Sequence, residues 1–141
     1  MKSYDEIYQY FMRHTRVDSL DLPTDIPSQI NLIHDGIMEF NILLRIGLDK
    51  LFYDDIKEEV NEDLQDELFV FLSECMTLSV YKNMLSEFVS TWEVFQNDVG
   101  RKYYKDQLNG RQELVNKQEA RLKTLKLAIS EEYVDTEDGV Y

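Results

Sequence analysis

The sequence predicts an all-α protein, a small helical bundle of about four helices with an extended acidic C-terminal arm. Five glycines and two prolines are few for 141 residues, and such a composition favours long helices over many short strands. Apolar residues recur at steps of three and four, which is the period of an amphipathic helix. Because 43% of the residues are hydrophobic, we expect one helical domain over residues 1–130 and an arm over residues 131–141.

The first helix is expected to begin at Ser3, because Ser3 and Glu6 have the spacing of a capping box. It should end near residues 14–16. Its apolar face has helical spacing and consists of Tyr4, Ile7, Tyr8, Phe11 and Met12. Residues 17–27 then form a connector, in which two prolines bias the residues before them away from helical geometry.

The second helix is expected to begin near Pro27, with Asp25 or Ser28 as its N-cap. Its apolar stripe consists of Ile30, Ile33, Ile37, Phe40 and Leu44. Gly36 lies inside this stripe, although glycine in a helix costs about 1 kcal/mol relative to alanine. We therefore expect Gly36 to mark a close crossing with another helix.

Gly47 is expected to end the second helix, and residues 48–55 should form either a short helix or a turn. Residues 63–95 are predicted to be helical, as one long helix or as two collinear pieces. One face of this segment is traced by Leu64, Leu68, Phe71, Leu72, Cys75, Met76, Ser79 and Lys82 or Asn83, and it is resumed by Phe88, Val89, Trp92 and Phe95. Gly100 is the predicted left-handed residue after this helix.

The last helix should run from about Lys102 to Ser130. Its heptad-like positions hold Tyr104, Leu108, Val115, Leu122, Leu125 and Ile129. Arg111 and Gln118 occupy the same stripe, and polar residues in such a seam often set the register of the helices. Residues 131–141 show no periodic or capping signal, so an extended arm is expected there.

The charge is large and unevenly distributed. The net charge is −13, with seven basic and twenty acidic residues in residues 1–100. Residues 101–126 reverse this balance with eight basic and three acidic residues, and residues 127–141 carry five acids and no base. Repulsion of phosphate argues against a general nucleic-acid binder, except for DNA that passes through a ring of subunits.

Two oppositely charged segments, residues 54–67 and residues 101–126, could join copies of the chain head to tail. The predicted inter-subunit residues on the acidic side are Asp54, Asp55, Glu58 and Glu59. Those on the basic side are Arg101, Lys105, Arg111 and Arg121. Most tyrosines and phenylalanines elsewhere in the chain are expected to contribute to packing.

No motif predicts chemistry, so we expect no catalytic residue, cofactor or metal, and no enzyme. The acidic block lacks the spacing of a calcium loop. Neither His14 nor His34 follows a glutamate at the spacing of a di-iron bundle. The single cysteine, Cys75, lies in an apolar run and should be buried and inert. A signal peptide and a membrane-spanning run are not evident, which favours synthesis in a reducing cytoplasm.

Several stretches are typical of short virion proteins from phages of Gram-positive hosts: YDEIYQYF, DLPTD, FYDD, STWEVFQNDVG and KDQLNGRQELVNKQE. Together with the helix order and the charged tail, they make the chain resemble head-to-tail connector (adaptor or neck) proteins of tailed bacteriophages. The resemblance implies a structural virion protein, made in the host cytoplasm, that forms a ring in the neck. Its implied partners are proteins, namely the portal, neighbouring copies and other neck or tail proteins, with no membrane partner.

The resemblance also implies a portal-contacting arm, which would consist of Glu131, Glu132, Tyr133, Val134, Asp135, Val140 and Tyr141. Two alternatives stay open from the sequence. One is a tail-assembly chaperone that is absent from finished particles, and the other is an acidic helical regulator that mimics DNA. The size of a ring and the identity of its partners are not encoded in any motif.

Overall fold

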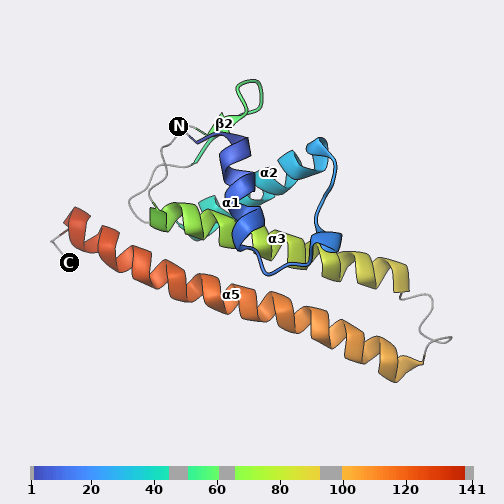
Figure 1. The fold of residues 1–141 in the computed structure, drawn as a ribbon. Helices are drawn as coiled ribbons and strands as arrows, with labels where there is room; N and C mark the ends of the chain where they lie inside the picture. Colours follow the sequence, from blue (N-terminus) through green and yellow to red (C-terminus); the bar gives the residue numbers. More distant parts are fainter. Residues whose placement is uncertain (1, 45–50, 61–65, 93–99, 139–141) are drawn as a thin grey trace.

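The structure is a computed structural model that describes residues 2–44, 51–60, 66–92 and 100–138. Within these residues the chain is almost entirely helical, so the predicted all-α class is confirmed (Figure 1). The elements in chain order are α1 (Tyr4–His14), the 3-10 helix η1 (Ser19–Asp21), α2 (Ile26–Leu43), β1 (Tyr53–Asp54), β2 (Glu59–Val60), α3 (Asp66–Trp92) and α5 (Arg101–Asp138).

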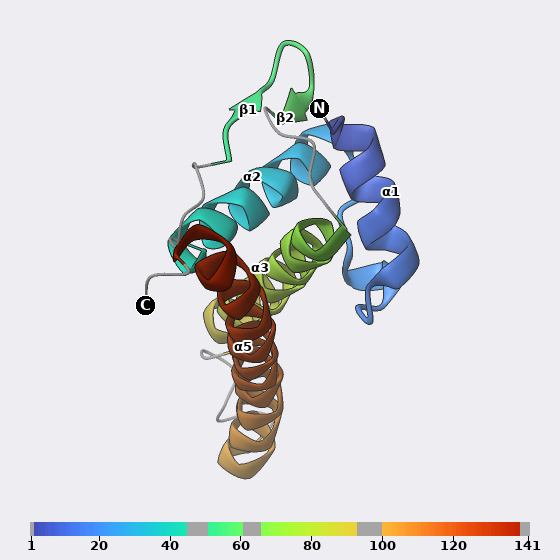
Figure 2. The same cartoon turned by 90° about the vertical axis from the view of Figure 1, so that its left-hand side faces the viewer.

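Helix α3 is the centre of the bundle. It contacts α2 on one side and the antiparallel α5 on another, and α1 crosses it (Figures 1 and 2). From Phe71 to Tyr81, every side chain except that of Glu74 is buried. A helix that is covered on several sides cannot be amphipathic, which explains why small polar residues such as Ser73 and Thr77 lie inside.

The core joins helices α1, α2, α3 and α5. Its largest fully buried side chains include Ile7, Phe11, Ile33, Ile37, Phe71, Leu72, Met76, Leu78 and Leu122. Cys75 is also fully buried, as predicted, and burial raises the pKa of its thiol well above the usual value. A thiol with a raised pKa carries little thiolate, so Cys75 serves as a small apolar core residue.

The predicted starts of α1 and α2 are confirmed. Ser3 caps α1, and its Oγ accepts a hydrogen bond from the Glu6 amide at 3.1 Å. Asp25, one of the two residues predicted for the second cap, accepts hydrogen bonds from the amide and the hydroxyl of Ser28 at 3.1 and 2.8 Å. The prediction of a close crossing at Gly36 is also confirmed, because an added Cβ would lie 2.5 Å from Cγ of Met76.

Residues 63–95 were predicted as one helix or two, and a single helix spans Asp66–Trp92. Leu64, Phe95 and the predicted stop at Gly47 lie outside the described residues. Gly100 has the predicted positive φ, at +89°. It stands directly before α5, and its carbonyl accepts the first helical hydrogen bond, from the Tyr104 amide at 3.1 Å.

The prediction of a short helix or a turn at residues 48–55 is corrected by a β-hairpin. Tyr53 pairs with Val60 and Asp54 pairs with Glu59. Glu59 also forms a bridge with Ser3, and the Val60 amide donates to the Lys2 carbonyl at 2.8 Å. The residues before α1 therefore pair with β2 through an isolated bridge, which a local periodicity could not reveal.

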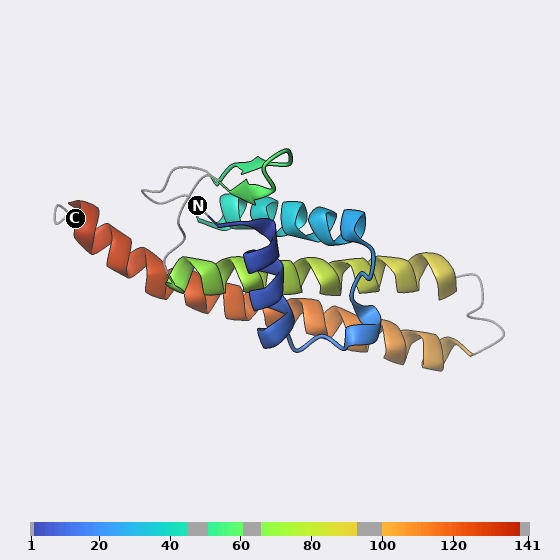
Figure 3. The same ribbon diagram turned by 45° about the horizontal axis from the view of Figure 1, so that its top comes forward.

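The prediction of an extended arm from residue 131 is also corrected. Helix α5 continues through Asp138 and covers 38 residues. No proline or glycine occurs between Gly110 and Gly139, and glutamates 131 and 132 are good helix formers. Figure 3 shows this end of α5 projecting beyond the first turn of α3.

Candidate functional site

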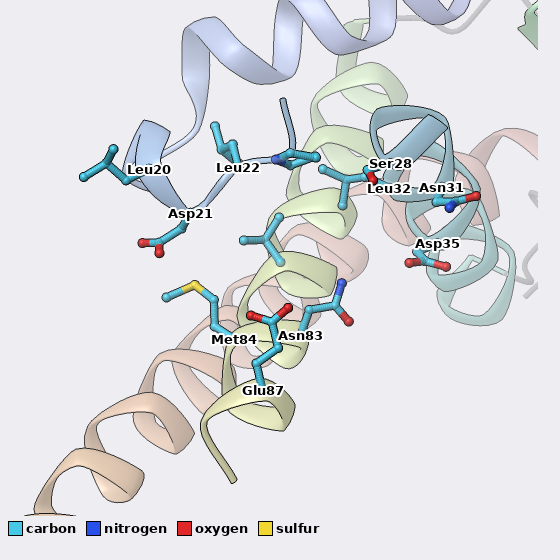
Figure 4. A pocket seen from close by; sticks show the side chains of 12 residues that line it. Leu20, Asp21, Leu22, Ser28, Asn31, Leu32, Asp35, Asn83, Met84 and Glu87 are labelled. Carbon is cyan, nitrogen blue, oxygen red and sulfur yellow. The ribbon is translucent and has the colours of Figure 1, made fainter. Parts of the chain in front are cut away.

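An acidic cleft is present among the described residues. It has a volume of about 420 Å³ and lies between the connector that contains η1, the N-terminal half of α2, and the C-terminal half of α3 (Figure 4). Its lining consists of Leu20, Asp21, Leu22, Pro23, Ser28, Asn31, Leu32, Asp35, Val80, Asn83, Met84 and Glu87.

The cleft combines an apolar base with a carboxylate rim. Leu22, Leu32 and Val80 are buried, and they meet the hydrophobic core. Asp21, Asp35 and Glu87 come from three different elements, as Figure 4 shows. No basic residue is among the lining residues. The cleft can therefore bind a group that is both apolar and positively charged.

The connector that forms one wall is tied to the helices beside it. The Pro23 carbonyl accepts hydrogen bonds from the Tyr8 hydroxyl at 3.4 Å and from the Gln29 side chain at 3.3 Å. Asp18 closes the turn before η1 by accepting from the Leu20 amide at 3.1 Å. These contacts hold a short non-helical segment against α1 and α2 and keep the wall in place. Leu20 stands at its edge and is 91% exposed.

Asp35 is an exposed residue, but its surroundings still disfavour ionisation of its carboxyl group. Partial desolvation raises the pKa of Asp35, nearby His34 opposes that shift, and Glu39 adds to it. A carboxylate with a raised pKa gains more from a cationic partner than a fully hydrated one. The electrostatics of the rim therefore favour a basic ligand.

A second, smaller cleft extends the acidic cleft along α3. It has a volume of about 220 Å³ and shares Asp21, Met84 and Glu87 with the larger one. Its remaining lining residues are Phe88, Thr91, Trp92 and Arg111. The two together form an elongated surface along the C-terminal half of α3.

Arg111 was predicted as an inter-subunit residue, and the structure places it at the far end of this surface. Its guanidinium lies 4.2 Å from the ring centroid of Phe88, in cation–π geometry. Nη1 also donates to the backbone carbonyl and to the side chain of Gln107, at 3.2 and 3.1 Å. Arg111 thus has intrachain partners, and a subunit contact is not needed to explain it.

The four predicted acidic interface residues lie on the β-hairpin, where they have structural roles. Asp54 accepts hydrogen bonds from the amides of Ile56 and Lys57, at 2.9 and 3.2 Å. The Glu58 carbonyl accepts from the Tyr4 amide at 2.8 Å, and Glu59 belongs to β2. These contacts order the hairpin and tie it to the start of α1.

Asp55, the remaining acidic candidate, holds the hairpin to two helices. Its Oδ1 accepts from the Tyr4 hydroxyl at 2.6 Å and lies 2.7 Å from His34 Nε2. The bonds from Tyr4 and His34 lower the pKa of Asp55. Burial raises the pKa of Tyr4, and the hydrogen bond to Asp55 raises it further.

The structure does not bring the acidic hairpin and the basic candidates together within one chain. Arg101 and Lys105 are exposed near the start of α5. Arg121 pairs instead with Glu74, with Nε 3.3 Å from Oε1. The predicted portal-contacting residues 131–135 lie on the last turns of α5, whereas Val140 and Tyr141 are outside the described residues.

The sequence pattern did not indicate the acidic cleft. Asp21, Asp35 and Glu87 are far apart in the chain, and each is an ordinary exposed acid on a helix or in a connector. Within the described part of the chain, no three His, Cys, Asp or Glu side chains are grouped to hold a metal ion. The helices described here also include none with the length and apolarity to span a bilayer.

Comparison with known proteins gives the chain a family. Residues 1–131 match the family model described as "YomZ prophage protein". The Bacillus subtilis (strain 168) protein named "SPbeta prophage-derived uncharacterized protein YomZ" is 30% identical over 134 residues, which cover 95% of this chain and 100% of that protein. No solved structure matches significantly.

These matches correct the resemblance to head-to-tail connector proteins, because both point to the YomZ prophage protein family and neither indicates a connector family. The same resemblance also implied a phage origin, and the matches support this, because both are to prophage proteins. The family match covers nearly the whole chain, so the assignment does not rest on one short segment. The chain belongs to the YomZ prophage protein family.

Proposed function

We propose that this prophage protein is a non-enzymatic binding protein that holds a basic amphipathic segment of another protein in its acidic cleft. The observation that carries the proposal is the composition of the cleft. Three carboxylates from separate elements surround a base of Leu22, Leu32 and Val80, and no basic residue is in the lining. An apolar face with lysine or arginine beside it matches both properties.

The shape of the surface favours a protein segment over a small cation. The acidic cleft continues into the smaller one along α3, and the shared residues make the two contiguous. Helices that dock in grooves place several anchors along one line, which such an elongated surface accommodates. DNA and RNA are disfavoured as occupants because their phosphates would face Asp21, Asp35 and Glu87.

Within the prophage, this role suits an assembly factor that shields a segment of a partner. A DNA mimic is supported less well, because it needs surface carboxylates but not an apolar base. A structural component of the phage particle would also bind other proteins, so this role is supported too. The copy number of the chain in purified, induced particles distinguishes these roles, because a structural component is present at a fixed stoichiometry and an assembly factor is absent.

Binding can be tested with a helical model peptide that carries leucines on one face and lysines on the other. Trp92 is the single tryptophan and lines the smaller cleft, so its fluorescence reports on occupancy. We expect saturable binding to the full chain that weakens with salt. The double variant Asp35→Asn/Glu87→Gln should weaken binding by roughly two- to thirtyfold, because two rim charge pairs contribute about 0.2–1 kcal/mol each.

The matched control is Asp106→Asn/Glu119→Gln, which removes the same charge from exposed positions of α5. It should leave the affinity nearly unchanged. If both double variants weaken binding equally, the peptide responds to net charge alone, and the cleft is not the binding site.

A further inference from the structure

A basic cleft lies on another part of the surface, between α3 and α5. It has a volume of about 340 Å³ and is lined by Arg16, Tyr81, Leu114, Lys117, Gln118 and Arg121. Three of these six residues are cationic and none is acidic, on a chain whose net charge is −13. Such a local reversal of charge is the expected property of an anion-binding surface.

Glu74 on α3 organises the cations of the basic cleft. Its carboxylate lies 3.3 Å from Arg16 Nη2 and 3.3 Å from Arg121 Nε. One carboxylate thus fixes two guanidinium groups, whose side chains are about half exposed. Glu74 contacts one nitrogen of each guanidinium, Nη2 of Arg16 and Nε of Arg121, and a guanidinium carries five N–H donors in all.

The chemistry of the basic cleft suits a carboxylate-bearing peptide. A guanidinium presents a planar fork of donors that matches a carboxylate in two-point contact. Lys117 adds a third positive charge from an exposed position, where it pairs with Glu113 at 3.1 Å. Leu114 is 39% exposed and, with Tyr81, supplies an apolar wall. An acidic segment that also carries aliphatic or aromatic residues therefore matches the site.

The C-terminal end of α5 has this composition. Residues 131–138 contain five acids and no base, together with Tyr133 and Val134. Helix α5 has 38 residues and α3 has 27, so at 1.5 Å per residue the longer helix exceeds the shorter by about 16 Å. The acidic end is the part that projects beyond α3 (Figure 3).

A chain cannot place this end in its own basic cleft. Arg121 and residue 131 lie on the same continuous helix, which separates them by about 15 Å along its axis. Acidic residues at a helix C-terminus also oppose the helix dipole, so a cationic partner would stabilise this end. We infer that the basic cleft binds the acidic C-terminal end of α5 from a second copy of the chain. The acidic cleft takes no part in this contact.

Complementation between two full-length variants tests the inference. The first variant, Lys117→Glu, damages the basic cleft and keeps the acidic end. The second, Glu131→Gln/Glu132→Gln/Asp135→Asn, keeps the cleft and neutralises three acids of the end. In analytical ultracentrifugation at low salt, we expect the wild-type chain to self-associate and each variant to associate about tenfold more weakly.

Mixing the two variants should restore one strong contact, between the intact cleft of one and the intact end of the other. The expected product is a one-to-one complex, whereas the wild type can also form longer head-to-tail assemblies. The matched control is Lys123→Glu, which reverses an exposed charge of α5 outside the cleft, and it should associate like the wild type. Circular dichroism verifies that every variant keeps its helix content.

Two outcomes would overturn the inference. A wild-type chain that stays monomeric at low salt rules out the contact. If the mixture of the two variants associates no better than each variant alone, any self-association of the chain occurs through another surface.

Discussion

The side-chain amide of Gln118 donates to the backbone carbonyl of Glu74 at 2.9 Å and to its carboxylate at 2.7 Å. Gln118 is 3% exposed and the Glu74 side chain 12%. Arg16 extends this network by donating to Gln118 Oε1 at 3.1 Å. Gln118, one of the two polar residues in the predicted seam of α5, thus has a specific partner on α3, and the pairing favours this register of the two helices.

Replacing Gln118 with leucine should destabilise the chain by about 1–3 kcal/mol, because a carbonyl and a carboxylate of Glu74 lose their buried donor. Urea unfolding followed by circular dichroism measures this loss. The control is Gln112→Leu, since the exposed Gln112 donates to Asn116 on its own helix, at 3.1 Å. Equal stability of Gln118→Leu and the wild type would show that the network does not set the register.

Gly36 is required by the crossing of α2 and α3. An alanine Cβ would lie 2.5 Å from Met76 Cγ and 3.4 Å from its backbone nitrogen and Cα. Gly36→Ala should therefore cost about 1–3 kcal/mol through overpacking, although alanine is the better helix former. Thermal unfolding of the variant measures the net effect.

Gly110 provides the matched control for this substitution. It also lies within a helix, but no atom is within 4 Å of an added Cβ. Gly110→Ala should stabilise the chain by about 0.5–1 kcal/mol. The opposite signs of the two substitutions separate a steric effect from helix propensity, and a stabilising Gly36→Ala would mean that the helices can move apart freely.

Glu58 occupies a backbone conformation that favours glycine, with φ at +54°. Glu58→Gly should relieve this cost and stabilise the chain by roughly 0.5–1 kcal/mol, which chemical unfolding can detect. Glu59→Gly is the comparison, because Glu59 has extended geometry in β2 and its replacement should destabilise. If both substitutions destabilise, the Glu58 side chain contributes more than its conformation costs.

Local patterns in the sequence were sufficient to predict much of the helical fold. Ser3 and Asp25 were found as caps because their bonding partners lie three residues away. The close crossing at Gly36 was predicted because glycine is unfavourable inside a helix, so a glycine within an apolar stripe indicates a neighbour that leaves no space for a side chain. Each of these features depends on neighbours within one or two helical turns, and such neighbours are visible in a sequence.

The features that sequence reasoning missed depend on distant partners or on weak local signals. The hairpin uses strands of two residues and pairs with the segment before α1. The acidic cleft needs Asp21, Asp35 and Glu87 to meet from three elements. The last turns of α5 were missed because their charged residues have helix propensity but do not show the apolar periodicity by which a helix is recognised in a sequence.

The contact between Asp55 and Tyr4 should make the docking of the hairpin dependent on pH. The pKa of Asp55 is lowered in the folded chain by hydrogen bonds from Tyr4 and His34. Stability from a lowered carboxyl pKa is present above the unfolded value, about 3.9, and is lost as the pH falls through the folded value. The pKa of Tyr4 is raised, so its contribution is present below the unfolded value, about 10, and is lost as the pH rises above it.

Tyr4→Phe removes the hydroxyl and keeps the ring, so it isolates this hydrogen bond from packing. We expect the carboxyl of Asp55 to titrate at a higher pH in the variant than in the wild type, measured by carbon-detected NMR. The loss of thermal stability between neutral and acidic pH should become smaller, because less of the stability then depends on an ionised Asp55. An Asp55 titration that is the same in both proteins would show that the hydroxyl does not stabilise the carboxylate, and the attachment of the hairpin would then rest on its strand pairing with the residues before α1.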